Sequence, residues 1–212
     1  MTTTYLQDRI FGNDSEKLIR KFLEYMRPLG EGMSDAEKIR FAKNYVEISV
    51  LLGALVAYHK PAAFVEIGCG LAIPSLTLVK MGITSGNAFD IEHRVHWGRE
   101  LASDLGLTLE CIERDFYQWD ADLPKGTFLI ADKPGSVKKN DNKMESDIVR
   151  LAIKLSLNIA LIPYLGKSKH ILRRCAEYAR KLNLSQYRTD YIVYSMHSKN
   201  QFDTTPILIG IK

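Results

Sequence analysis

The segment Phe64–Leu76, FVEIGCGLAIPSL, places a carboxylate next to two closely spaced glycines. An apolar run typical of a strand leads through Glu66 into Gly68 and Gly70, and a helix-like segment begins at Pro74. Glycine at such a turn lets the backbone approach a ligand and adopt dihedral angles that a Cβ would forbid. Proline suits the first turn of a helix. The pattern indicates a ligand-binding turn, and the alternative is a tight strand–helix turn that binds nothing.

The charge of this turn narrows the kind of ligand. A dinucleotide-binding turn carries a third glycine, where this chain has Ile73. It would also bring an anionic pyrophosphate toward Glu66. A ligand that carries positive charge and no phosphate is instead attracted by the carboxylate. The residues therefore favour a cationic, nucleoside-like ligand over a dinucleotide.

Further acids follow the next strand-like runs. Asp90 ends NAFD, at about the distance past the glycines where an acid reaches ribose hydroxyls in nucleotide-binding folds. One carboxylate accepts from both hydroxyls in charge-assisted hydrogen bonds. Asp115 follows the third run and either contacts the ligand or caps the segment after it. Asp132 and Lys133 follow the fourth run. Asp90 and Asp115 remain open to a simpler reading as surface or capping carboxylates.

The pattern of elements gives these residues a common edge. The predicted strands are 63–67, 87–91, 108–113, 127–132 and 159–164, and the predicted helices between them are 74–80, 94–105, 144–157 and 168–182. This alternation is typical of a parallel sheet with helices on both faces. Two long runs without an intervening helix, 187–196 and 206–211, predict a terminal antiparallel hairpin. We expect an α/β fold with a seven-stranded, mostly parallel sheet.

Two helices are expected to precede the sheet. Asn13 or Asp14 is a suitable cap for the first, which would run to Arg27. Ser34 and Glu37 have the spacing of a capping box for the second, which would run to His59. The predicted organisation is an N-terminal helical cap over residues 1–61 and a ligand-binding domain over residues 62–212.

From Ala62 to Lys212 the chain resembles class I S-adenosylmethionine (SAM) methyltransferases. The resemblance lies in the acid-and-glycine turn, in the acids at the strand ends and in the order of the elements. The resemblance implies SAM as cofactor and a class I methyltransferase sheet. In similar enzymes the acid at the position of Glu66 holds the methionine amino group. The glycines at the positions of Gly68 and Gly70 accommodate the ligand. It further implies cofactor contacts from residues at the ends of the second and third strands: Asp90 to ribose, Ile91 to one adenine face, Asp115 to the adenine amino group, and the Phe116 amide to the ring.

The fourth strand would face the acceptor. Amine methyltransferases of nucleic acids have Asp or Asn, two prolines and an aromatic residue there. This chain has LIADKPGS, so Asp132 and Pro134 match, whereas Lys133 and Gly135 replace a proline and the aromatic residue. Asp132 and Lys133 are the candidate catalytic residues, with Lys133 read either as a proton acceptor or as a solvated loop lysine. The lysine and acid set of a ribose 2′-O-methyltransferase is incomplete, because the last strand carries no glutamate.

The distribution of charge bears on the identity of the methyl acceptor. The net charge is +4, and lysines cluster after the fourth and fifth strands, which favours RNA over a small molecule as acceptor: Lys133, Lys138, Lys139, Lys143, Lys167 and Lys169. Arg173, Arg174, Arg180 and Lys181 are expected off the core face of their helix and solvated. An altered fourth-strand motif also permits a catalytically silent SAM-binding or scaffold protein.

Composition limits the remaining possibilities. Three widely spaced cysteines favour a reducing compartment, and no apolar run suggests a membrane span, so we expect a soluble, cytoplasmic protein without membrane partners. His93 and His96 have no companion Cys or carboxylate cluster that would indicate zinc, so no metal is expected. The sequence does not define the oligomeric state.

Overall fold

The computed structural model describes residues 5–27, 32–91, 94–115, 123–133, 142–163, 168–184, 186–194 and 203–211. The helical elements are α1 (Leu6–Phe11), the 3-10 turn η1 (Gly12–Asp14), α2 (Ser15–Tyr25), α3 (Asp35–Tyr58), α4 (Ile73–Lys80), α5 (Val95–Asp104), α6 (Asn142–Lys154) and α7 (Ser168–Leu182). The strands are β1 (Phe64–Ile67), β2 (Gly86–Asp90), β3 (Glu110–Glu113), β4 (Phe128–Asp132), β5 (Asn158–Ile162), β6 (Gln186–Tyr194) and β7 (Asp203–Ile211).

The strands form one mixed sheet in the order β3-β2-β1-β4-β5-β7-β6. Neighbouring strands from β3 to β5 are parallel, and β7 runs antiparallel to both β5 and β6. The predicted α/β class is therefore confirmed. Strand β7 begins at Asp203, three residues before the predicted start, and Pro206 lies within it, paired with Tyr191. The residues between β6 and β7, and the segment 116–122 after β3, lie outside the described residues.

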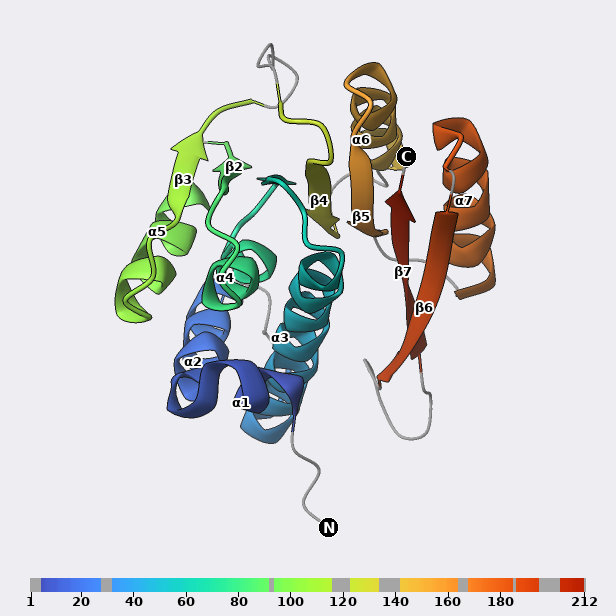
Figure 1. Cartoon of the computed structure of the whole chain (residues 1–212). Coiled ribbons are helices and arrows are strands. Elements are labelled where there is room, and N and C mark those ends of the chain that lie inside the picture. Colours follow the sequence, from blue (N-terminus) through green and yellow to red (C-terminus); the bar gives the residue numbers. More distant parts are fainter. Residues whose placement is uncertain are drawn as a thin grey trace.

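Helices cover both faces of the sheet (Figure 1). On one face, α3 and α4 bury apolar side chains against Phe64 of β1 and Phe128 of β4. On the other face, α6 and α7 pack against Val65 and Leu129, the next residues of the same strands. Because side chains alternate along a strand, this arrangement puts Glu66 and Asp132 on the α3 and α4 face. Both carboxylates therefore point from the sheet toward α3 and α4.

Helix α3 is the centre of that face. The capping box predicted at its start is confirmed, since Ser34 accepts from the Glu37 amide and the Glu37 side chain accepts from the Ser34 amide. Its later half buries most of its apolar side chains, whereas Tyr58 at its end is exposed. Among the described residues α3 alone is long and apolar enough to cross a membrane by length and composition, and half of that stretch is buried inside the fold.

Three helical segments precede α3, where the sequence analysis expected one helix. The short helix α1 was missed because its N-terminus is held from a distance: the Leu6 and Gln7 amides donate to the two carboxylate oxygens of Glu47 on α3, at 2.7 and 3.1 Å. Such a cap leaves no local sequence signal. Asp14 does precede α2 as predicted, but its side chain makes no capping hydrogen bond.

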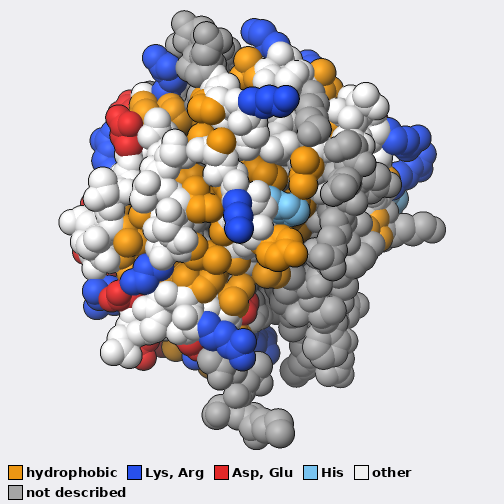
Figure 2. Space-filling view, in the orientation of Figure 1, with side chains coloured by type: hydrophobic (Ala, Val, Ile, Leu, Met, Phe, Trp, Pro, Cys, Tyr) orange, Lys and Arg blue, Asp and Glu red, His pale blue; other side chains and the backbone are white. Residues whose placement is uncertain are grey.

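On the face shown in Figure 2, the charged side chains of the described residues are scattered over the surface. Hydrophobic side chains gather there over α3 and α4, and Lys and Arg side chains lie singly around them. The largest exposed apolar side chains at the ends of these helices are Tyr58 and Met81. This face offers no continuous basic patch among the described residues.

Candidate functional site

The glycine turn between β1 and α4 has the strained geometry that its sequence predicts. Gly68, Gly70 and Ala72 all have positive φ angles, of 66°, 48° and 54°. The Cys69 amide donates to the Phe89 carbonyl at 3.0 Å, which draws the turn over β2. A Cβ added to Gly98 of α5 would lie 3.2 Å from the Gly70 carbonyl oxygen, so α5 packs directly on the turn. The hydrogen bond to β2 on one side and helix α5 on the other hold the turn in place. Gly68 and Gly70 have no side chains, so the surface of the turn at these positions consists of backbone atoms.

Asp90, at the end of β2, is bonded to this turn. One carboxylate oxygen accepts from the Gly70 amide at 2.7 Å, and the other accepts from the Ile91 amide at 2.8 Å. The Asp90 residue is 7% exposed, whereas Ile91 beside it is 55% exposed. The Arg114 amide donates to the Asp90 carbonyl, which brings the half-buried Asp115 next to this strand end. Phe116 lies outside the described residues.

Glu66 lies in β1, two residues before the glycine turn, and is buried there. It is 1% exposed, and one of its oxygens accepts from both the amide and the hydroxyl of Ser75 on α4, at 3.0 and 2.5 Å. Burial raises the pKa of Glu66 to about 8; the Ser75 hydroxyl lowers it and the Asp132 carboxylate raises it further. At neutral pH the group is therefore mostly a neutral acid, which corrects the expectation of a standing negative charge. Desolvation of a fully buried carboxylate is the physical reason.

Asp132 and Lys133 form a closed pair at the end of β4. The Lys133 ammonium lies 2.5 Å from one Asp132 oxygen and 3.8 Å from the centre of the Tyr45 ring. The Ser49 hydroxyl donates to the other Asp132 oxygen. The side chains of Lys133 and Asp132 are 11% and 8% exposed, so the reading of Lys133 as a solvated loop lysine is wrong. The Lys133 ammonium is thus held by a carboxylate on one side and by the face of an aromatic ring on the other.

Four site residues were missed by sequence reasoning. Ser49 and Ser75 satisfy the two buried carboxylates, Tyr45 covers Lys133, and Tyr25 of α2 lies against Gly70. The spacing of Tyr45 and Ser49, one helical turn apart, is the signal that would have indicated a shared target. The position of Tyr25 had no local signal, because it depends on the packing of α2 against α5.

The opposite face of the sheet contributes a buried ionic cluster. Glu145 of α6 is fully buried, and its carboxylate accepts from Tyr178 at 3.1 Å and pairs with Arg174 at 3.3 Å, both on α7. The expectation that Arg174 is solvated is therefore wrong, since a buried acid requires a partner. Met144, the preceding residue, lies over the turn, with its methyl carbon 3.5 Å from a Cβ added to Gly68.

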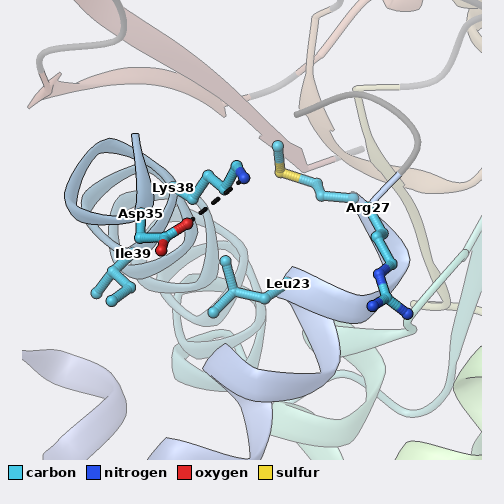
Figure 3. Close-up of a pocket in the computed structure, with 6 residues that line it drawn as sticks. Leu23, Arg27, Asp35, Lys38 and Ile39 are labelled. Atoms are coloured by element: carbon cyan, nitrogen blue, oxygen red, sulfur yellow. Dashed lines mark ion pairs between the residues drawn. The ribbon is translucent and has the colours of Figure 1, made fainter. Parts of the chain in front are cut away.

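A cavity of about 370 Å³ lies between the end of α2 and the start of α3 (Figure 3). Its lining combines apolar and charged side chains: Leu23, Met26, Ile39, Arg27, Asp35 and Lys38. Asp35 and Lys38 pair with each other at 3.6 Å, as the dashed line marks. Leu23 lies two residues before Tyr25 and so sits on another face of α2, and Arg27 follows the end of that helix. The residues that line the cavity do not include those of the glycine turn.

The described part of the chain carries no candidate metal cluster. It contains no group of three or more His, Cys, Asp or Glu residues arranged to hold a metal ion. His93 falls outside the described residues, and His96 packs against Trp97 with ring centres 5.0 Å apart. The three cysteines are free and buried.

No protein-family model matches the chain, and no curated protein matches its sequence. Solved structures do match its fold. Magnesium protoporphyrin IX methyltransferase from Synechocystis PCC 6803 with bound SAM is 12% identical, with 99% of each chain covered and a TM-score of 0.58. Precorrin-6y C5,15-methyltransferase from Geobacter metallireducens GS-15 is 12% identical over 78% of this chain and 89% of that one, with a TM-score of 0.55.

An RNA enzyme is similar as well. The Pyrococcus abyssi tRNA (uracil-54, C5)-methyltransferase in complex with S-adenosyl-L-homocysteine (SAH) is 12% identical over 79% of this chain and 38% of that one, with a TM-score of 0.52. The chain has the fold of the class I SAM-dependent methyltransferases. The similar proteins act on a porphyrin, a corrinoid precursor and tRNA, so the fold by itself leaves the acceptor open.

Proposed function

We propose that this protein is a SAM-dependent methyltransferase that binds its cofactor at the turn between β1 and α4. Glu66 carries the argument, because it accepts from the amide of Ser75, the third residue of α4. The first amides of a helix have no partner within the helix and bind anions such as phosphate. Here a carboxyl group of the chain itself takes the Ser75 donor. A nucleoside ligand without phosphate fits this turn, and a dinucleotide does not.

The neighbouring residues support the nucleoside half of the ligand. Asp90 is held at the turn by Gly70 and Ile91, and its carboxylate is the acceptor that ribose hydroxyls require. Ile91 presents an exposed apolar side chain next to it, suitable for one face of an adenine ring. Asp115 follows β3 on the same edge of the sheet and is the acceptor proposed for the adenine amino group. Gly68 and Gly70 carry no side chain and hold the positive φ angles of the turn, so the ligand would meet backbone atoms there.

The bound cofactor supplies an activated methyl group, so the protein's task is to align the acceptor for in-line attack. The pair of Asp132 and Lys133 ends β4, next to β1, and shapes this side of the site. With Lys133 bound to a carboxylate and covered by Tyr45, a lysine base is disfavoured. We therefore assign the pair to positioning of the acceptor. A nucleophile that loses its proton late, or not at all, fits this arrangement best.

Two observations support two different classes of methyl acceptor. The cavity between α2 and α3 supports a small molecule with an apolar body, because three apolar side chains line it together with Arg27 and the paired Asp35 and Lys38. The lysines that follow the fourth and fifth strands support RNA. Lys143 is one of them, and it is described and exposed. Lys138, Lys139 and Lys167 lie outside the described residues, and the side chain of Lys169 is not described. We place the small molecule first and RNA second.

The test is transfer of labelled methyl from SAM to two pools, total RNA and a metabolite extract. Label in the metabolite pool supports the first acceptor class, and label in RNA supports the second. For RNA, anisotropy titrations should show an affinity that falls with salt, with a slope of about −0.7 per phosphate neutralised on a single strand. SAM binding without transfer to either pool would indicate the silent SAM-binding alternative and refute enzymatic activity.

A further inference from the structure

Tyr25, near the end of α2, lies directly on the glycine turn. A Cβ added to Gly70 would lie 3.3 Å from the Tyr25 hydroxyl oxygen and 3.6 Å from the ring carbon that carries it. The amide of the same glycine donates to Asp90. The phenol oxygen and the Asp90 carboxylate therefore both lie next to Gly70. A ribose bound to Asp90 would lie beside the same glycine.

A ladder of contacts between α2 and α5 holds the phenol there. On α2, residues 17, 21 and 25 follow one another at helical spacing and form one stripe. Lys17 donates to the Asp104 carbonyl at 2.9 Å, and Lys21 pairs with Glu100 at 2.6 Å. Tyr25 meets the Trp97 ring edge to face, with ring centres 5.8 Å apart. Since α5 also packs on the Gly70 carbonyl, the ladder fixes Tyr25 relative to the turn.

The surroundings of the hydroxyl are suited to a donor. The negative charges of Asp90 and Asp132 and the positive charge of Arg94 act on its pKa. Burial raises the pKa of Tyr25, Arg94 opposes this and Asp90 adds to it. The phenol therefore keeps its proton across the neutral range. A protonated phenol donates one hydrogen bond and accepts others, as a ribose hydroxyl requires.

We infer that Tyr25 is a cofactor-contacting residue, whose phenol covers the ribose edge of the bound nucleoside and hydrogen-bonds to it. The inference rests on the proposed function, and it adds a ligand contact from the N-terminal helices. It gives α2 a direct role in cofactor binding, in place of a role as an acceptor cap alone. Lys17 and Lys21 are positioning residues that act through Tyr25.

The experiment is calorimetry with SAH and with 5′-methylthioadenosine, which keeps the adenosine and lacks the amino acid. Tyr25→Phe should weaken both ligands by a similar factor, about fivefold, because one neutral hydrogen bond is lost. Tyr25→Ala should weaken both further, since the covering ring is lost as well. Homocysteine lacks the ribose, and its effect on the unfolding midpoint should be the same in wild type and Tyr25→Phe.

Two controls separate a ligand contact from a structural role. Tyr58→Phe makes the same chemical change at a side chain that is 81% exposed, and should leave both affinities unchanged. The thermal midpoint of ligand-free Tyr25→Phe should equal that of the wild type. Wild-type affinity in Tyr25→Phe, or a loss confined to SAH, overturns this inference alone. Absence of SAH binding by the wild type overturns the proposed function and this inference together.

Discussion

Asp90 and Gly70 are joined by a hydrogen bond of 2.7 Å between the glycine amide and a carboxylate oxygen. The bond links the end of β2 to the turn after β1, although twenty residues of chain separate the two. It sets the position of the carboxylate relative to the glycine backbone. A nucleoside ligand would meet both groups at once, so this link is the geometric basis of the proposed cofactor site.

Asp90→Ala should weaken SAH binding about 10- to 150-fold, because a charge-assisted hydrogen bond contributes roughly 1.5–3 kcal/mol. Calorimetry gives the two dissociation constants. Glu177→Ala, at an exposed acid of α7, is the control and should bind SAH as the wild type does. Equal affinity in Asp90→Ala and the wild type would remove Asp90 from the ligand site.

Lys133→Met should be strongly destabilising, because it leaves the buried Asp132 carboxylate without its cation. Breaking a buried pair in this way costs roughly 3–5 kcal/mol. Urea unfolding measures the loss, and Lys154→Met at an exposed site of α6 is the control. Adding Asp132→Asn should restore most of the stability, while methyl transfer stays slow in the double variant. Full turnover in the double variant would exclude the pair from the acceptor side.

The wild type should lose stability relative to Glu66→Gln as the pH rises. The pKa of Glu66 in the folded protein, about 8, lies above its ordinary value of 4.5, so the folded state holds the proton more tightly. Its contribution is fully present below about pH 4.5 and is lost as the pH rises to about 8, at up to about 1.4 kcal/mol per pH unit.

Urea unfolding of both proteins between pH 5 and 9 measures this difference, and ionisations shared by the two proteins cancel. The difference should fall through the window and level off above pH 8. A difference that is constant across the whole range would mean that Glu66 is ionised in the folded protein at neutral pH.

Gly53→Ala should destabilise the protein, contrary to the usual effect of this change within a helix. Alanine normally gains about 1 kcal/mol over glycine there. At this position the added Cβ would lie 2.5 Å from the Pro74 carbonyl oxygen, where α3 crosses α4. Overpacking of this kind costs about 1–3 kcal/mol. The thermal midpoint should fall, and Ala54→Gly reports the ordinary propensity effect next to it. A raised midpoint in Gly53→Ala would refute this close contact.

Local patterns were sufficient to predict the elements of the sheet. The acid–glycine turn, the capping box of α3 and the alternation of strands and helices are all encoded within a few residues, and the structure contains them. The strand ends then place Asp90, Asp115 and Asp132 on one edge, which follows from the parallel topology alone.

Features that depend on contacts distant in sequence were not predictable. Helix α1 is capped by Glu47 from α3, and Tyr25 is placed by the ladder to α5. The state of Glu66 depends on burial and on Ser75 and Asp132, which a strand pattern does not reveal. The pairing of Arg174 with a buried acid likewise needed the contact between α6 and α7.

The central claim is that this chain binds a SAM-type nucleoside at the turn between β1 and α4. Its most direct test is a pair of calorimetric titrations of the wild type, one with SAH and one with NAD. We predict saturable binding of SAH at one site per chain and no binding of NAD, because Glu66 occupies the helix terminus that a pyrophosphate would need. Binding of NAD, or no heat with SAH, would contradict the claim.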